Sequence, residues 1–179
     1  FWTDAGIDTG PILVQKEVPI GPDDTTGSFY YDRIFLLGVD AIEEAVDQVE
    51  RGTAPKIPQD ESQATYDPLC RDEHVAIDWL RPAREVYDLV RGADPQPGSW
   101  AVRQDERVRF YDCRLDAAER GEPGEVLGID ERGAAVALRG GTLVVGRMRH
   151  GASPKKVAPQ ELEAEGKLAA GDRLEGVKA

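Results

Sequence analysis

The residues best suited to chemistry gather in the first ten positions of the sequence. Asp4 and Asp8 are carboxylates, Thr9 adds a hydroxyl, and Gly6 and Gly10 flank the second acid. Glycine adopts left-handed backbone angles at little cost, so the chain can turn tightly around Asp8. A carboxylate in such a loop can serve as a general base or can orient a histidine. We therefore expect a rigid loop that presents the Asp8 side chain.

Asp8 needs a partner to do chemistry, and the sequence places none beside it. His74 lies in a polar connector and His150 precedes a glycine, so we expect both to be structural or exposed. Residues 7–10 also match the hydrophobic-Asp-Thr-Gly motif of aspartic proteases, but those enzymes use two such loops and this sequence has one. Cys70 stands four residues from His74, and two ligands do not make a zinc site.

The composition favours a globular chain without a membrane segment. Its 179 residues are 40% hydrophobic, and no apolar run approaches the roughly 20 residues of a membrane helix. The start lacks the features of a signal peptide and is not methionine, which predicts a processed or truncated chain. Cys70 and Cys113 are too few for a disulfide framework and indicate a reducing cytoplasm. A single disulfide between them is the alternative.

Acidic residues dominate the first part of the chain. The net charge is −12: residues 1–75 hold five Lys or Arg against sixteen Asp or Glu, and residues 76–179 hold seventeen against eighteen. Phosphate backbones bind clustered cations, so the first part should repel nucleic acid. The second part could carry a basic face, although for any single one of these cations a solvated surface is the favoured interpretation. The candidates are Arg103, Arg107, Arg109, Arg147, Arg149, Lys155 and Lys156.

The first half of the chain predicts a strand, a long helix and a connector. Residues 12–20 are apolar after a proline and predict a strand. Apolar residues then recur at three- and four-residue spacing, which predicts one amphipathic helix that begins near Asp23 and ends at Gly52. Residues 53–68 hold three prolines and few apolar anchors, so we expect an extended surface connector.

The spacing of apolar residues changes from a helical to a strand pattern near residues 80–98. A helix is expected over residues 83–91, and a short terminal helix over residues 159–170. Between them, short apolar runs alternate with glycine-rich turns, which is typical of a small antiparallel barrel or sandwich. We divide the chain into domains at 1–80 and 81–179. The expected strands cover residues 100–102, 107–111, 125–129, 134–138 and 142–145.

Residues 4–15 resemble the motif shared by formyltransferases that use 10-formyltetrahydrofolate. Six further landmarks follow in the family's order: residues 22–25, the helix ending at Gly52, residues 63–66, residues 77–79, Arg91 and residues 97–100. The succession is similar to methionyl-tRNA formyltransferase and to the hydrolase domain of 10-formyltetrahydrofolate dehydrogenase. The resemblance covers nearly the whole chain.

The resemblance implies an α/β fold, in which the end of a Rossmann-like formyltransferase domain precedes a small open β-barrel of OB-like type. It implies that Asp8 is the catalytic aspartate and that no metal is used. The family's catalytic asparagine and histidine lie upstream of Asp8 and outside this sequence, so we expect the chain alone to be inactive. It also implies that the pterin of 10-formyltetrahydrofolate, the formyl donor, is lined by Thr3, Asp4, Ala5, Gly6 and Ile7.

The activity expected from the resemblance is formyl transfer to an amine in the cytoplasm, with no membrane partner. Methionyl-tRNA is the first choice of acceptor, bound through the C-terminal domain. A hydrolase that releases formate, a sugar N-formyltransferase and a non-catalytic binding module are the alternatives. A basic face and a steep salt dependence would indicate tRNA, whereas a hydrolase should show neither.

Overall fold

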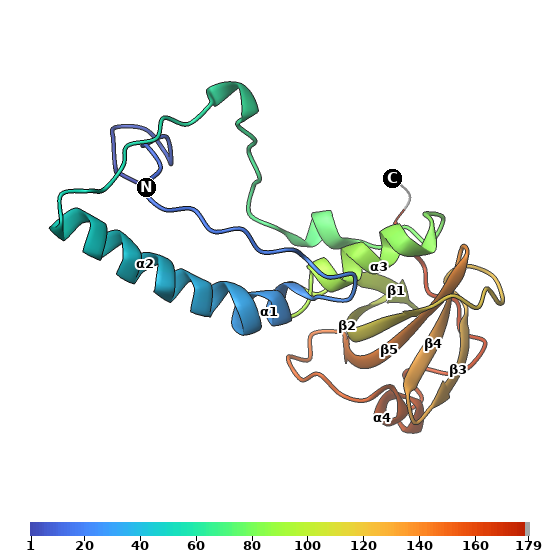
Figure 1. Ribbon diagram of the computed structural model, residues 1–179. Coiled ribbons are helices and arrows are strands. Elements are labelled where there is room, and N and C mark those ends of the chain that lie inside the picture. Colours follow the sequence, from blue (N-terminus) through green and yellow to red (C-terminus); the bar gives the residue numbers. More distant parts are fainter. Residues whose placement is uncertain (178–179) are drawn as a thin grey trace. The chain divides into compact units, whose positions relative to one another are not determined.

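The computed structural model describes residues 1–177, and its helices and strands are shown in Figure 1. The chain forms two compact units. The first unit contains residues 1–22 and 28–69. The second contains residues 23–27 and 70–177.

The predicted long helix forms with one irregularity, and from Ser28 onward it belongs to the first unit. It comprises α1 (Thr26–Phe29), the π-helical η1 (Tyr30–Ile34) and α2 (Phe35–Glu50), so it begins three residues after Asp23. Gly52 follows α2 with a φ of +68°, which confirms the predicted glycine cap. The connector after it is extended apart from the short 3₁₀ helix η2 (Glu61–Gln63).

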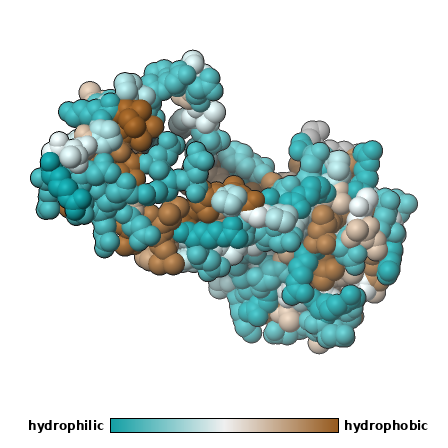
Figure 2. All heavy atoms as spheres, viewed as in Figure 1, coloured by the Kyte–Doolittle hydropathy of each residue, from teal (hydrophilic) through white to brown (hydrophobic). Residues whose placement is uncertain are grey.

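One expectation for the first unit is wrong. The strand predicted over residues 12–20 is reduced to one bridge, in which Ile12 pairs antiparallel with Ile57. A strand needs a neighbour for its backbone groups, and within residues 1–177 no second segment runs alongside the rest of it. No residue of α2 is buried, and Leu36 and Ile42 are 61% and 66% exposed. Figure 2 shows hydrophobic groups gathered along this helix.

The second unit contains a five-stranded antiparallel sheet, which confirms the strands predicted from the period change. Its order is β1-β2-β5-β4-β3, and β1 and β3 form the two edges. The sheet is open, so the OB-like barrel remains a prediction. The strands are β1 (Trp100–Arg103), β2 (Glu106–Asp116), β3 (Val126–Asp130), β4 (Gly133–Leu138) and β5 (Gly141–His150).

The core lies between the sheet and α3 (Ala83–Gly92), the second predicted helix. Val86 and Val90 of α3 are 1% and 0% exposed, and Trp79 packs edge-to-face on Phe110 at 5.9 Å between ring centroids. The short 3₁₀ helix η3 (Asp72–Val75) precedes this core. The terminal helix, α4 (Pro159–Ala164), is shorter than predicted because Gly166, with a φ of +70°, follows it.

No helix among the described residues has the length and apolarity needed to span a bilayer. Both cysteines are free thiols, Cys70 exposed and Cys113 buried, so the single disulfide does not form. Burial raises the pKa of the Cys113 thiol, with a further contribution from the carboxylates of Asp94 and Asp112.

Candidate functional site

The loop of residues 4–10 is closed by the Asp4 carboxylate. Its Oδ1 accepts hydrogen bonds from the backbone N–H of Gly6 at 2.9 Å and from the Thr9 hydroxyl at 2.8 Å. The tight turn predicted around Asp8 is present, with Asp8 itself at a φ of +56°. Neither loop glycine has a positive φ; instead a side chain at Gly10 would lie 1.6 Å from the carbonyl oxygen of Trp2. The glycines therefore permit close approach rather than left-handed angles.

Gln59 holds this loop from a distant part of the chain. Its side-chain amide donates to the carbonyl oxygens of Asp8 at 2.8 Å and Gly10 at 2.7 Å. Ile57, two residues earlier, exchanges backbone hydrogen bonds of 2.7 and 3.0 Å with Ile12. No sequence pattern points to Gln59, because it lies in a polar, proline-rich connector.

Asp8 opens onto a cavity of about 620 Å³ in the first unit. No hydrogen bond within residues 1–177 reaches its carboxylate, which leaves both oxygens available to a substrate. A free carboxylate at the wall of a cavity can accept a proton from an amine or orient a second catalytic group. The lining includes Ile7, Asp8, Thr9, Gln59, Asp60 and Tyr66.

Neither histidine belongs to this loop. His74 accepts a hydrogen bond at Nδ1 from the backbone N–H of Arg71, and His150 pairs with Glu106 at 2.9 Å, all in the second unit. Thr3, Ala5 and Ile7 are exposed around the Asp4 turn. No group of three or more metal-binding side chains occurs within the residues that the structure describes.

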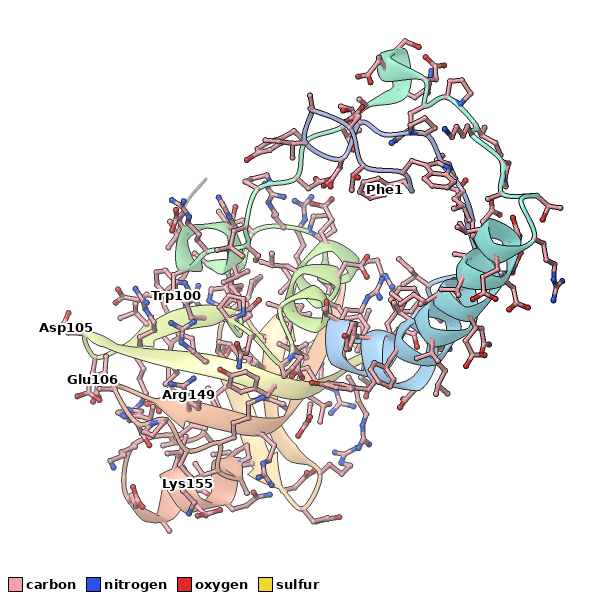
Figure 3. The ribbon with its side chains drawn as sticks, turned by 90° about the vertical axis from the view of Figure 1, so that its left-hand side faces the viewer. Phe1, Trp100, Asp105, Glu106, Arg149 and Lys155 are labelled. Carbon is pink, nitrogen blue, oxygen red and sulfur yellow. The ribbon has the colours of Figure 1, made fainter. Side chains whose placement is uncertain are left out.

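A basic face lies on one side of β1, β2 and β5. Trp100 pairs across the strands with Arg109, which pairs in turn with Arg149, so the three side chains share one side. Tyr111 and Arg147 form the next pair on that side. Figure 3 shows Trp100, Arg149 and Lys155 on this unit. We define the basic face as Trp100, Arg107, Arg109, Tyr111, Arg147, Arg149, Lys155 and Lys156.

Aromatic rings support two of these cations. The Arg107 guanidinium carbon lies 4.0 Å from the Trp100 ring centroid, and Lys156 Nζ lies 3.7 Å from that of Tyr111. Arg103, the seventh predicted candidate, is not on the face: it is 8% exposed and pairs with Asp172 at 2.5 Å.

Carboxylates reduce the charge of the basic face. Asp72 accepts from Arg107 at 2.6 Å and from Arg109 at 2.7 Å, and these guanidinium groups, Arg109 above all, lower the pKa of Asp72. Lys156 lies 3.6 Å from Asp94. Arg147 is exposed and has no carboxylate partner among the described residues. Arg149 also has no carboxylate partner among those residues, but it is half-buried and donates to the Ser153 carbonyl oxygen, so Arg147 is the more available of the two to a ligand.

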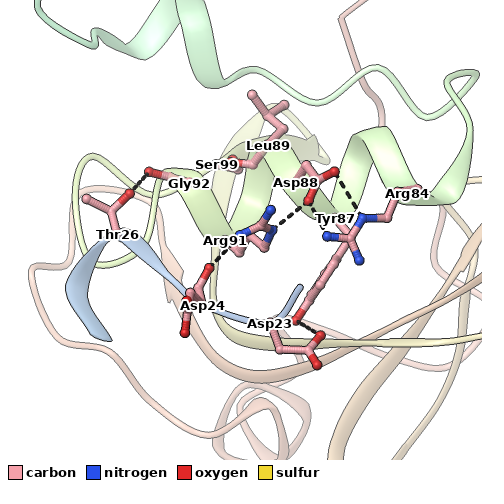
Figure 4. Close-up of polar contacts among 10 residues, drawn as sticks. All are labelled: Asp23, Asp24, Thr26, Arg84, Tyr87, Asp88, Leu89, Arg91, Gly92 and Ser99. Atoms are coloured by element: carbon pink, nitrogen blue, oxygen red, sulfur yellow. Dashed lines mark hydrogen bonds and ion pairs between the residues drawn. The ribbon is translucent and has the colours of Figure 1, made fainter. Parts of the chain in front are cut away.

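Residues 23–27 belong to the second unit because they bind α3 (Figure 4). The Thr26 hydroxyl donates to the carbonyl oxygen of Gly92 at 2.6 Å, and Arg91 donates to that of Asp24 at 2.8 Å. The Tyr87 hydroxyl donates to Asp23 at 3.1 Å. Burial of Tyr87 and the Asp23 carboxylate raise the pKa of Tyr87 to about 12.

A comparison with known families agrees with this arrangement. The family described as "Formyl transferase, C-terminal domain" matches residues 70–162, more than half of the chain. The chain belongs to the formyltransferase family. The matched residues include all five strands, α3 and most of α4.

Curated relatives in the family are longer than this chain. A methionyl-tRNA formyltransferase of Geotalea daltonii is 36% identical over 177 residues, which cover 98% of this chain and 52% of that protein. A cytosolic 10-formyltetrahydrofolate dehydrogenase of Xenopus laevis is 39% identical over 131 residues, or 72% of this chain and 14% of that protein. This chain therefore spans about half of the first relative and a small part of the second.

Solved structures share the fold. HypX from Aquifex aeolicus in complex with tetrahydrofolic acid has a TM-score of 0.75 and 23% identity, over 90% of this chain and 28% of HypX. An N-formyltransferase from Helicobacter canadensis has a TM-score of 0.60 and 16% identity, over 80% of this chain and 52% of that chain. At these identities the likeness concerns the fold alone.

Proposed function

We propose that the intact protein transfers a formyl group from 10-formyltetrahydrofolate to an amine, with methionyl-tRNA as the acceptor. The observation that carries this proposal is the free Asp8 carboxylate at a cavity, in a chain of the formyltransferase family. Relatives that match 93% and 98% of the chain bear the name methionyl-tRNA formyltransferase. We propose cytoplasmic localisation on the same grounds.

In this reaction the amine nitrogen forms a bond to the formyl carbon, and the bond from that carbon to the folate nitrogen breaks. Asp8 accepts the proton released by the amine, directly or through a histidine that it orients, and the same group returns a proton to the folate nitrogen as it leaves. An asparagine and a histidine, from protein outside this chain, would stabilise the negative charge that develops on the formyl oxygen. Loss of one such donor costs about 2.7–4 kcal/mol, so the isolated chain should be inactive.

The donor would lie against the loop before Asp8. Asp4 shapes that loop internally, which leaves the backbone of its neighbours free to contact the pterin ring. The domain division proposed for the intact enzyme is 1–80 for the end of the catalytic domain and 81–179 for an OB-like C-terminal domain. The pterin contacts proposed are Thr3, Asp4, Ala5, Gly6 and Ile7.

The basic face supports tRNA as the acceptor, because clustered cations suit a phosphate backbone. Hydrolysis of the donor is the second candidate. Asp72 and Asp94 offset part of the positive charge, and the Xenopus relative is a 10-formyltetrahydrofolate dehydrogenase. A hydrolase would need no cationic surface.

One assay on the protein purified from its source cells tests these proposals. Its native mass is measured first, and labelled 10-formyltetrahydrofolate is then supplied with methionyl-tRNA, with an amino-sugar nucleotide or with buffer alone. Label in methionyl-tRNA supports the proposal. Label in the sugar or in free formate would identify the sugar or water as the acceptor in place of methionyl-tRNA. If a native species heavier than 19.6 kDa shows no turnover with any of them, a binding module is favoured.

A further inference from the structure

Asp8 adopts a backbone conformation that needs external support. Its φ of +56° is unfavourable for a residue with a Cβ. Aspartate tolerates this backbone angle better than most side chains do, but less well than glycine. The Asp4 carboxylate accepts hydrogen bonds from Gly6, before Asp8, and from Thr9, after it. It makes no hydrogen bond to the backbone of Asp8 itself. Some other group must hold the turn.

Gln59 supplies the missing contact. A side-chain amide nitrogen carries two hydrogens, and Gln59 Nε2 directs them to the carbonyl oxygens of Asp8 and Gly10, at 2.8 and 2.7 Å. These carbonyls stand on either side of Thr9, so one nitrogen spans the second half of the turn. Among the described residues, Gln59 is the one side chain that binds the Asp8 backbone.

Gln59 is itself fixed relative to the chain that leaves the loop. Ile57 pairs with Ile12 through two backbone hydrogen bonds, and the Trp2 indole donates to the carbonyl oxygen of Pro55 at 2.8 Å. The connector is therefore tied to both ends of the loop within four residues of Gln59. Because the connector is held in place, the Gln59 side chain in turn holds the backbone of Asp8 in place.

We propose that Gln59 is a positioning residue, which sets the backbone of Asp8 and so aims its carboxylate into the cavity. This inference rests on the proposed function, in which Asp8 is the catalytic aspartate. Small displacements of a catalytic group reduce turnover strongly, by about 100-fold for 1 Å. Gln59 should therefore affect kcat far more than KM.

The test uses Gln59→Glu and Gln59→Leu, which both remove the two N–H donors, one with a negative charge and one without. Gln15→Glu is the matched control, because Gln15 is exposed in the same unit and its side chain makes no described hydrogen bond. In the intact enzyme we expect kcat to fall about 10- to 100-fold in both Gln59 variants, with KM within about threefold. The control should match the wild type.

A second readout does not depend on activity. In the isolated chain, NMR carbon shifts of Asp8 report its positive φ, and both Gln59 variants should lose that signature while the sheet signals stay unchanged. Retention of the signature in both variants, or an unchanged kcat despite its loss, would overturn the inference. If the intact wild-type protein transfers no formyl group, the proposed function fails and the Asp8 shifts alone decide the role of Gln59.

Discussion

The Arg109 guanidinium donates a hydrogen bond to the Asp72 carboxylate, with 2.7 Å between Nη2 and Oδ2. This pair joins η3 to β2, and Arg109 also donates to the carbonyl oxygen of Gly98 at 2.9 Å. Trp100 adds a third link, because its indole N–H donates to the Asp72 carbonyl oxygen at 2.8 Å. The start of the second unit is thus fixed to its sheet by polar contacts.

Substitution of Asp72 by asparagine should lower the free energy of unfolding by about 0.5–1 kcal/mol, because the Asp72 side chain is 42% exposed and solvent screens its ion pairs. The folded pKa of Asp72 lies below the unfolded value of about 3.9. Its contribution is therefore present above that value and is lost as the pH falls through the folded pKa. Urea unfolding of wild type and variant should differ at pH 7, and the difference should shrink as the pH falls below about 3.9 toward the folded pKa. Glu163→Gln, an exposed change in α4, serves as the control.

Two glycines near the end of α3 should respond in opposite ways to alanine. Gly98 has a φ of +83°, and a Cβ there would lie 2.3 Å from the Tyr111 hydroxyl oxygen, so Gly98→Ala should destabilise by about 1–3 kcal/mol. Gly92 ends α3 with open space around it, so Gly92→Ala should stabilise by up to about 1 kcal/mol. Thermal unfolding of the two variants decides this, and equal shifts would contradict it.

Asp8→Asn in the intact protein should reduce formyl transfer by about 10²- to 10⁴-fold, because asparagine cannot accept the proton. Folding should be unchanged, since no hydrogen bond among the described residues reaches the Asp8 carboxylate. Asp40→Asn, on an exposed part of α2, removes the same charge as a control. Wild-type turnover by the Asp8 variant would exclude Asp8 from the chemistry.

Arg147→Glu should weaken binding of tRNA and reduce the slope of log affinity against log salt by about 1, because Arg147 is exposed and has no carboxylate partner among the described residues. Arg132→Glu reverses the same charge at the turn between β3 and β4, away from that face, and should leave the slope unchanged. Filter binding at several salt concentrations gives both slopes. Identical slopes in all three proteins would remove the basic face from the acceptor site.

Tyr87 should ionise with a pKa of about 12 in the folded protein, against about 10 for free tyrosine. Because the folded pKa is raised, Tyr87 contributes fully to the free energy of unfolding below about pH 10. That contribution is lost as the pH rises through about 12. An absorbance titration should show a late component near pH 12 that Tyr87→Phe removes. A Tyr87 that titrates near about 10 would mean that neither the burial of its ring nor its contact with Asp23 holds in solution.

The sequence alone determined the elements that depend on local periodicity. The three- and four-residue spacing before Gly52, the helix of residues 83–91 and the five short strands all follow from which positions are apolar, and the structure confirms them. The Asp8 loop could be found for a similar reason, since its acids and glycines are neighbours in the chain.

Tertiary structure decided everything that depends on a distant partner. Residues 12–20 have the composition of a strand, but only Ile12 finds a neighbour, and a strand exists only through pairing. The basic face emerged from the register of β1, β2 and β5, which brought Trp100 beside Arg109 and buried Arg103. Gln59 reached Asp8 across 51 positions, a contact that no local pattern encodes because hydrogen bonds require proximity in space rather than in sequence.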